Sequence, residues 1–174
     1  MPAYRPSSNA SSETTERIPQ KRLPSNKAEV ARPETRPRLA LIAHDGKKPE
    51  MVSFGLRHAS TLRAFELVAT GTTGLLLQRE CGLTVQRVLS GPLGGDVQIA
   101  SMVAQGDISA VFFLVDPLDK HPHDPDIQAM LRICNVHNIP LATNMATADI
   151  MLVALRRAES ASLKAAASDR PAIG

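Results

Sequence analysis

Five short apolar segments alternate with segments of helical periodicity, and this alternation constrains the fold of the 174-residue chain more than any other feature. Each apolar segment is too short to cross a bilayer and is typical of a strand buried on both faces of a sheet. Apolar residues at helical spacing follow each one. The expected strands are Leu39–Ala43, Leu67–Ala69, Leu83–Leu89, Ala110–Val115 and Ile139–Ala142. The expected helices are Met51–Phe65, Gly74–Cys81, Asp96–Gln105, Asp126–His137 and Thr147–Arg157.

Strict alternation of strands and helices with short connections predicts an α/β fold. We expect a three-layer, doubly wound, five-stranded parallel sheet, Rossmann-like or flavodoxin-like, forming a single domain over residues 38–157. The chain is long enough for one such domain and too short for two ordinary ones. In sheets of this kind, ligands bind beyond the carboxyl ends of the strands.

The two ends of the chain differ from the middle. Residues 1–37 contain six of the 13 prolines and no glycine, and they have few apolar side chains. We therefore predict a disordered N-terminal arm. A mitochondrial presequence is the rival interpretation, which four glutamates and the scattered prolines disfavour. Residues 158–174 are rich in Ala and Ser and are expected to form a tail, partly helical or disordered.

Charge and cysteine content restrict the possible partners and compartment. The sequence pI is about 9.1, but the net charge is +4 over residues 1–38, −3 over residues 39–155 and +2 over residues 156–174. A mildly acidic central region without interleaved aromatic and basic residues predicts no nucleic-acid partner. The start of the chain has no apolar secretory signal, and no segment is long enough to predict a membrane span. Two cysteines without a CxxC motif favour free thiols and a cytoplasmic protein.

Polar motifs follow all five expected strands, so the fold should bring them to one edge of the sheet. Glycines, hydroxyls, imidazoles and carboxylates in five converging loops are typical of a binding or catalytic site. The motifs are His44-Asp45-Gly46-Lys47-Lys48, Thr70-Gly71-Thr72-Thr73, Ser90-Gly91-Pro92-Leu93-Gly94-Gly95-Asp96, Asp116-Pro117 with His121-Pro122-His123-Asp124-Pro125-Asp126, and Thr143-Asn144.

The Thr70–Thr73 motif suits a phosphate group, because hydroxyls and unpaired amides at a helix N-terminus can hold a dianion. Simple N-capping by threonine is the alternative. The motif is not a P-loop, since no Gly-Lys-Ser/Thr follows. Lys48 could supply a positive charge for the phosphate, or it could be a solvated surface lysine.

Two further motifs carry carboxylates at expected helix starts. Asp96 follows two glycines and, taken alone, is either a functional carboxylate or an N-cap. His123 precedes Asp124-Pro125-Asp126, which could equally be a capping sequence with Pro in the first turn. The histidines and aspartates show no paired ligand spacing on a regular element, so we expect no metal.

Taken together and in this order, the loops resemble those of the methylglyoxal synthase family over roughly residues 38–155. The matching segments include Ala43-His44-Asp45, Ala69-Thr70-Gly71-Thr72-Thr73-Gly74, Leu89-Ser90-Gly91-Pro92-Leu93-Gly94-Gly95-Asp96, Phe113-Leu114-Val115-Asp116-Pro117-Leu118 and Pro122-His123-Asp124-Pro125-Asp126. Asn138-Ile139-Pro140 and Thr143-Asn144-Met145-Ala146-Thr147-Ala148-Asp149 complete the match.

The resemblance implies a lyase that converts dihydroxyacetone phosphate to methylglyoxal and inorganic phosphate without a cofactor, usually as a homohexamer. It implies that inorganic phosphate is a product and possible inhibitor. Asp96 corresponds to the catalytic carboxylate, and His123, His44 and Asp126 are the other expected catalytic residues. The implied substrate and phosphate ligands are His44, Lys48, Thr70, Gly71, Thr72, Thr73, Ser90, Gly91 and His123, with Asp45 and Asp116 as supporting acids.

The same α/β unit also resembles the allosteric domain of carbamoyl-phosphate synthetase, a non-catalytic module that binds phosphates and nucleotides. The inosine-monophosphate cyclohydrolase domain is a weaker alternative. Asp96, His44 and His123 favour the enzyme, because a binding module has no need of a base. The chain departs from better-known members of the family in its long N-terminal arm and in its segment after Asp149.

Overall fold

The computed structural model describes residues 36–118 and 124–168. The strands β1 (Arg38–Ala43), β2 (Glu66–Ala69), β3 (Val85–Arg87), β4 (Ala110–Leu114) and β5 (Leu141–Ala142) form one parallel sheet in the order β3-β2-β1-β4-β5. The predicted α/β fold with a five-stranded parallel sheet is therefore confirmed. Residues 1–35, which hold nearly all of the expected N-terminal arm, lie outside the described residues, and so do residues 169–174.

The strand order reverses at β1, which lies between β2 and β4. In the register of the sheet, Leu39 of β1 is opposite Leu67 of β2 and Ala110 of β4. The chain winds outward from β1 to β3 in one direction and then from β4 to β5 in the other. Such a reversal opens a crevice at the carboxyl ends of the two central strands, where ligands of doubly wound sheets bind.

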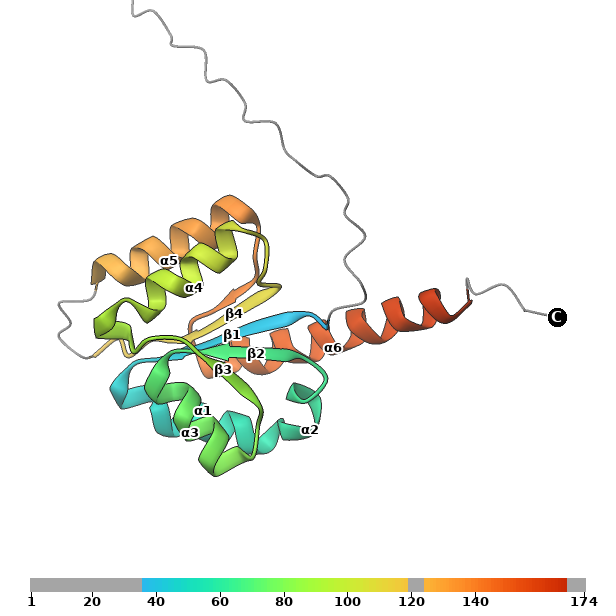
Figure 1. The fold of residues 1–174 in the computed structure, drawn as a ribbon, viewed down its shortest axis with the longest axis horizontal. Coiled ribbons are helices and arrows are strands. Elements are labelled where there is room, and N and C mark those ends of the chain that lie inside the picture. Colours follow the sequence, from blue (N-terminus) through green and yellow to red (C-terminus); the bar gives the residue numbers. More distant parts are fainter. Residues whose placement is uncertain (1–35, 119–123, 169–174) are drawn as a thin grey trace, which may run out of the picture. The chain divides into compact units, whose positions relative to one another are not determined.

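Helices cover both faces of the sheet (Figure 1). Helices α4 and α5 lie on one face, and α1, α2, α3 and α6 lie on the other, as the two core clusters show. The helices are α1 (Lys48–Arg57), α2 (Ala59–Leu62), α3 (Gly71–Cys81), α4 (Gly95–Ala104), α5 (Asp124–His137) and α6 (Met145–Ser168).

Alternation along the central strands divides the core into two layers. Leu39 and Leu41 of β1 are buried on the α1, α3 and α6 side, whereas Ala40 and Ile42 are buried on the α4 and α5 side. Because a parallel sheet buries both faces, its strands are apolar at every position rather than at alternate ones. This explains why the central strands could be found from short continuous apolar runs.

Several element boundaries differ from those expected. The expected helix Met51–Phe65 is two helices, α1 and α2, which meet at His58, where the helical backbone conformation is interrupted. Helix α3 begins at Gly71, three residues early, so the threonine motif forms its first turn. The edge strand β3 is shorter than Leu83–Leu89. Helix α6 extends past Arg157 to Ser168, in keeping with the high helix propensity of its alanines.

An ion-pair cluster joins the end of α1 to the start of α6. The Asp149 carboxylate lies 2.8 Å from His58 Nε2 and 3.3 Å from an Arg57 guanidinium nitrogen. Burial acts to raise the pKa of Asp149, but the hydrogen bonds from His58 and Arg57 outweigh it and lower the pKa overall. The carboxylate form thus favours the folded state, and this contribution is lost only as the pH falls through the lowered pKa. His58 therefore has a structural partner that its sequence position did not reveal.

The helices in the described ranges include none that combines the length and apolarity needed to span a membrane.

Candidate active site

The loops after β2 and β3 meet at the backbone of Leu89. Its carbonyl oxygen accepts a hydrogen bond from the Gly71 amide at 3.0 Å, and its amide donates to Gln98 Oε1 at 2.9 Å. A Cβ atom on Gly95 would lie only 1.8 Å from the same carbonyl oxygen, so glycine is required there. Leu89 therefore brings the first turn of α3 and the first turn of α4 together.

The threonine motif forms the N-terminus of α3. Thr70 precedes the helix in an extended conformation, and its hydroxyl donates to the Thr73 hydroxyl at 3.2 Å. Both side chains are buried, so their mutual bond holds the turn, whereas Thr72 is exposed. The first amides of a helix have no carbonyl partner within the helix. Gly71 uses its amide on Leu89, which leaves the Thr72 and Thr73 amides directed toward any anion at this helix end.

The loop from Ser90 to Gly95 sets where α4 begins. The Ser90 carbonyl accepts bonds from the amides of Leu93 and Gly95, both at 3.0 Å, which closes a short 3-10 turn over Gly91–Leu93. Gly94 has a φ of +89°, a conformation that favours glycine. Asp96 is thereby the second residue of α4.

The Asp96 carboxylate is partly exposed in the first turn of α4. Its Oδ1 accepts a hydrogen bond from the amide of Val97 at 3.0 Å. No hydrogen bond to its Oδ2 occurs among the described residues, so that oxygen remains able to accept a proton. Asp96 therefore bonds to its own helix end through one oxygen and lies at the carboxyl edge of the sheet.

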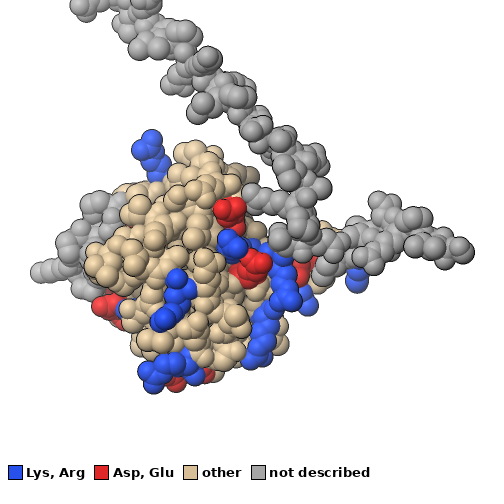
Figure 2. Space-filling view, viewed as in Figure 1, with Lys and Arg blue, Asp and Glu red and all other residues tan. Residues whose placement is uncertain are grey.

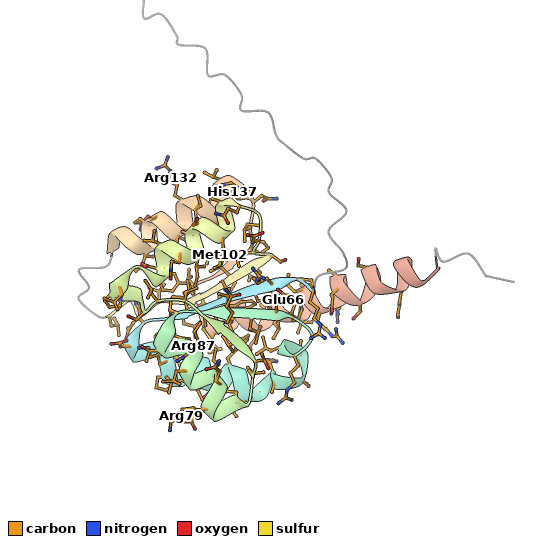
Figure 3. The ribbon with its side chains drawn as sticks, in the orientation of Figure 1. Glu66, Arg79, Arg87, Met102, Arg132 and His137 are labelled. Atoms are coloured by element: carbon orange, nitrogen blue, oxygen red, sulfur yellow. The ribbon has the colours of Figure 1, made fainter. Side chains whose placement is uncertain are left out.

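A hollow of about 430 Å³ lies beside this junction. Arg87 of β3 lines it, and its side-chain methylenes pack over Gly74 in α3, where an added Cβ would lie 2.7 Å from Arg87 Cγ. Figure 3 shows Arg87 on the α3 side of the sheet, opposite Met102 of α4. The hollow is lined by Gly71, Thr72, Leu75, Arg87, Val88, Leu89 and Ser90.

The loops after β1 and β4 form a second junction. The Asp116 amide donates to His44 Nδ1 at 3.2 Å, and the His44 amide donates to the Leu114 carbonyl at 3.1 Å. The imidazole contacts Phe113 edge to face, with ring centroids 5.2 Å apart. Because Phe113 belongs to the core layer beneath α4 and α5, His44 lies toward the face that carries Asp96.

The remaining predicted residues near His44 serve partly as structural supports. Asp116 Oδ1 accepts the Leu118 amide at 3.2 Å, and its Oδ2 would lie 2.5 Å from a Cβ on Gly46. Lys48 forms an ion pair with Asp45. Asp116 thus holds the loop after β4, and Asp45 holds Lys48.

Lys47 and Asn144 line another hollow, of about 390 Å³, at the same edge. Lys47 pairs with Glu50 at 2.6 Å, and this hydrogen bond raises the pKa of the Lys47 ammonium. The Asn144 side chain accepts the Thr147 amide at 3.0 Å and so caps the start of α6. The lining residues are Lys47, Glu50, Leu114, Val115, Pro117, Thr143 and Asn144.

The structure gives limited information on two predicted catalytic residues. His123 lies outside the described residues, and Asp126 lies in the first turn of α5. Within the described ranges, no group of three or more His, Cys, Asp and Glu side chains is arranged to hold a metal ion. On the face drawn in Figure 2, several acidic and basic side chains lie next to one another, and large areas between these groups are uncharged.

Sequence reasoning missed Gln98, which bonds to Leu89, and Arg87, which lines the same hollow as Thr72 and Ser90. The sequence around a helical glutamine does not indicate that its side chain bonds to the backbone after a neighbouring strand. Arg87 could have been noticed only from its position three residues before Ser90. A further hollow of about 320 Å³ lies at the opposite edge, where Arg36, Arg63 and Glu66 are among its lining residues, and it contains none of the predicted site residues.

Known proteins are similar to the central region of this chain in sequence and in structure. The family model described as MGS-like domain matches residues 50–143. A methylglyoxal synthase of Thermus thermophilus is 57% identical over 119 residues, which cover 68% of this chain and 94% of that protein. The methylglyoxal synthase of Ralstonia nicotianae is 56% identical over 124 residues, covering 71% and 92%. The crystal structure of methylglyoxal synthase from Elizabethkingia anophelis matches with a TM-score of 0.64 and 49% identity, covering 67% of this chain and 77% of that chain.

Proposed function

Because the chain belongs to the methylglyoxal synthase family, we propose that it converts dihydroxyacetone phosphate to methylglyoxal and inorganic phosphate. The observation that carries the proposal is the junction at Leu89, which joins an anion-binding helix start to the helix start that bears Asp96. A module that only binds phosphate requires the anion-binding start of α3 and has no need of a carboxylate at the start of α4.

Asp96 is the proposed base. It takes a proton from the hydroxymethyl carbon, and the electron pair of that C–H bond forms the enediolate, with the negative charge on the former carbonyl oxygen. The hydroxyl on the deprotonated carbon then gives up its proton to the former carbonyl oxygen and becomes the aldehyde carbonyl, while the carbon–carbon double bond shifts to the phosphate-bearing carbon. The C–O bond to phosphate breaks, the phosphate keeps the electron pair, and the proton held by Asp96 passes to it. The enol that remains takes up a proton on its CH2 carbon, releases its hydroxyl proton and becomes methylglyoxal.

His44 is the proposed donor to the developing enediolate oxygen. The Asp116 amide donates to Nδ1, so Nδ1 of the neutral ring is an acceptor and Nε2 carries the proton. A fixed N–H donor stabilises charge that appears in the transition state. His123 is proposed to share this task and Asp126 to assist it, by the family resemblance alone.

The phosphate group is proposed to bind at the start of α3. Thr72 and Ser90 line the adjoining hollow, and buried Thr70 and Thr73 hold the turn. The Thr72 and Thr73 amides and Gly91 are the further proposed ligands. Lys48 supplies positive charge once its carboxylate partner Asp45 is shared or displaced. Orientation of the C–O bond out of the enediolate plane decides whether phosphate leaves, so positioning governs the outcome.

The assembly and compartment are also proposals. A homohexamer is proposed from the family resemblance. Exposed apolar side chains on α1, the loop before α4, α4 itself and α6 are surface that self-association would cover. Free Cys81 and Cys134, whose thiol pKa values burial raises, suit the reducing cytoplasm. The exposed residues are Leu56, Leu93, Val97, Ile150 and Val153.

Thr72→Ala is expected to raise the KM for dihydroxyacetone phosphate and the inhibition constant of inorganic phosphate by similar factors. A hydrogen bond to a charged group contributes about 1.5–3 kcal/mol, which corresponds to roughly a tenfold to hundredfold weakening. Thr84→Ala is the matched control, because Thr84 is exposed at the opposite edge of the sheet. If phosphate inhibited the wild type and Thr72→Ala with equal inhibition constants, Thr72 would not be a phosphate ligand.

Activity is expected to survive prolonged treatment with a chelator followed by dialysis, and elemental analysis should find no stoichiometric metal. The proposed chemistry needs a basic Asp96, and a divalent ion bound to its carboxylate would lower that basicity. Loss of turnover that one added divalent ion restores would show that the reaction is metal-assisted.

The direct test of the proposed function is to incubate the purified chain with dihydroxyacetone phosphate and assay methylglyoxal and phosphate. Both products should appear in equal amounts. Binding of the substrate without turnover would instead favour a regulatory module of the same fold.

A further inference from the structure

Gln98 makes a bond that the proposed mechanism does not use. It lies one turn after Gly94 in α4, and its own amide donates to the Gly94 carbonyl at 3.0 Å. Its side-chain Oε1 accepts the Leu89 amide at 2.9 Å. Among the described residues, no other side chain bonds to the backbone of Leu89.

Leu89 holds α3 through a separate bond, because its carbonyl accepts the Gly71 amide at 3.0 Å. The two bonds of this one residue therefore connect the proposed phosphate-binding turn to the second turn of α4. The hydrogen bonds from Leu93 and Gly95 to Ser90 lie within the connection itself. Val88 packs against the core cluster that holds Ile99 and Val103 of α4, and the Gln98 side chain adds a direct hydrogen bond from α4 to the exit of β3.

We propose that Gln98 is a positioning residue that sets the placement of Asp96 relative to the bound phosphate group. This inference rests on the proposed function. Gln98 itself is exposed on α4 and contributes no buried apolar surface, so its side chain acts mainly through this one bond. Without this acceptor, the exposed Leu89 amide bonds to water, and α4 keeps its core packing through Ile99 and Val103 but loses its side-chain hydrogen bond to the exit of β3.

The expected consequence is specific to this chemistry. A base held slightly out of place still forms some enediolate, but the intermediate is more often reprotonated before phosphate leaves. In D₂O, reprotonation puts deuterium into the remaining dihydroxyacetone phosphate, whereas elimination releases phosphate. The ratio of deuterium uptake to phosphate release thus reports positioning, and a loss of stability alone does not change it.

The test compares Gln98→Leu, Gln98→Glu and Gln105→Leu with the wild type. Gln105 is the matched control, because it follows directly after the last residue of α4, seven residues after Gln98, and its side chain bonds only to Ser101. Gln98→Leu should lower kcat roughly tenfold, as expected for a small misplacement of a base, and should raise the deuterium-to-phosphate ratio several-fold. Its inhibition constant for inorganic phosphate should stay within about twofold of the wild-type value, because the α3 turn is retained. Gln98→Glu keeps an acceptor oxygen and should recover most of kcat, and Gln105→Leu should match the wild type.

The proposal is overturned if Gln98→Leu matches Gln105→Leu in kcat and deuterium ratio, or if Gln98→Glu is as impaired as Gln98→Leu. It is also overturned if Gln98→Leu fails to fold while Gln105→Leu folds, since the bond would then serve stability. A wild-type chain without turnover overturns the proposed function itself, whereas an active wild type with an unchanged Gln98→Leu overturns only this inference.

Discussion

Asp96→Asn is expected to lower turnover of dihydroxyacetone phosphate by about a thousandfold, within the range that general base catalysis contributes. The amide keeps the shape of the side chain and can still accept the Val97 amide through its oxygen, so the start of α4 should be preserved. It cannot accept a carbon-bound proton. The variant should therefore still bind a phosphorylated enediolate analogue, as measured by calorimetry.

Asp107→Asn is a suitable control for this variant, because Asp107 lies at the other end of α4, just before β4. The control should retain wild-type turnover. Near-normal turnover of Asp96→Asn would remove Asp96 from the mechanism and would move the search for a base to the loop after β4.

Gly95→Ala is expected to lower both stability and turnover sharply. The added Cβ would lie 1.8 Å from the Leu89 carbonyl oxygen and 2.6 Å from its carbon, and both atoms are backbone and cannot swing away. Overpacking of this kind costs about 3 kcal/mol or more, which corresponds to a fall of roughly 6–12 °C in Tm. The shift would also displace Asp96, the next residue.

Gly91→Ala is the matched control for stability. A Cβ on Gly91 would meet nothing within 4 Å, and Gly91 lies in the same loop. Its Tm should stay within about 1 °C of the wild-type value, in line with surface substitutions generally. Equal melting temperatures for Gly95→Ala and Gly91→Ala, measured by calorimetry, would contradict the close approach of α4 to Leu89.

The central elements of the fold could be predicted because their signals are local. Ala110–Leu114 is a continuous apolar run, as a strand covered on both faces requires, and Gly82 ends α3 in the left-handed conformation. Boundaries that depend on other parts of the chain could not be predicted in the same way. The break at His58 coincides with its contact to Asp149, 91 residues later in the sequence.

In the candidate site, too, local features could be predicted and contacts between distant segments could not. Motif order and residue chemistry pointed to Thr72, Asp96 and His44 at one edge of the sheet. The roles of their neighbours depend on bonds between segments. Burial turns Thr70 and Thr73 into supports of the helix start, and Lys48 pairs with Asp45. The contact of Gln98 with Leu89 depends on how α4 packs beside the end of β3, so the sequence did not predict it.

One measurement tests the central claim most directly: the reaction of the purified chain with dihydroxyacetone phosphate in D₂O, followed by phosphorus and proton NMR in the same tube. The account predicts that inorganic phosphate appears at the rate at which substrate disappears, with an equal amount of methylglyoxal whose methyl group carries one deuterium from the solvent. Release of phosphate without methylglyoxal, or an unchanged substrate spectrum at enzyme concentrations that bind the substrate, would contradict it.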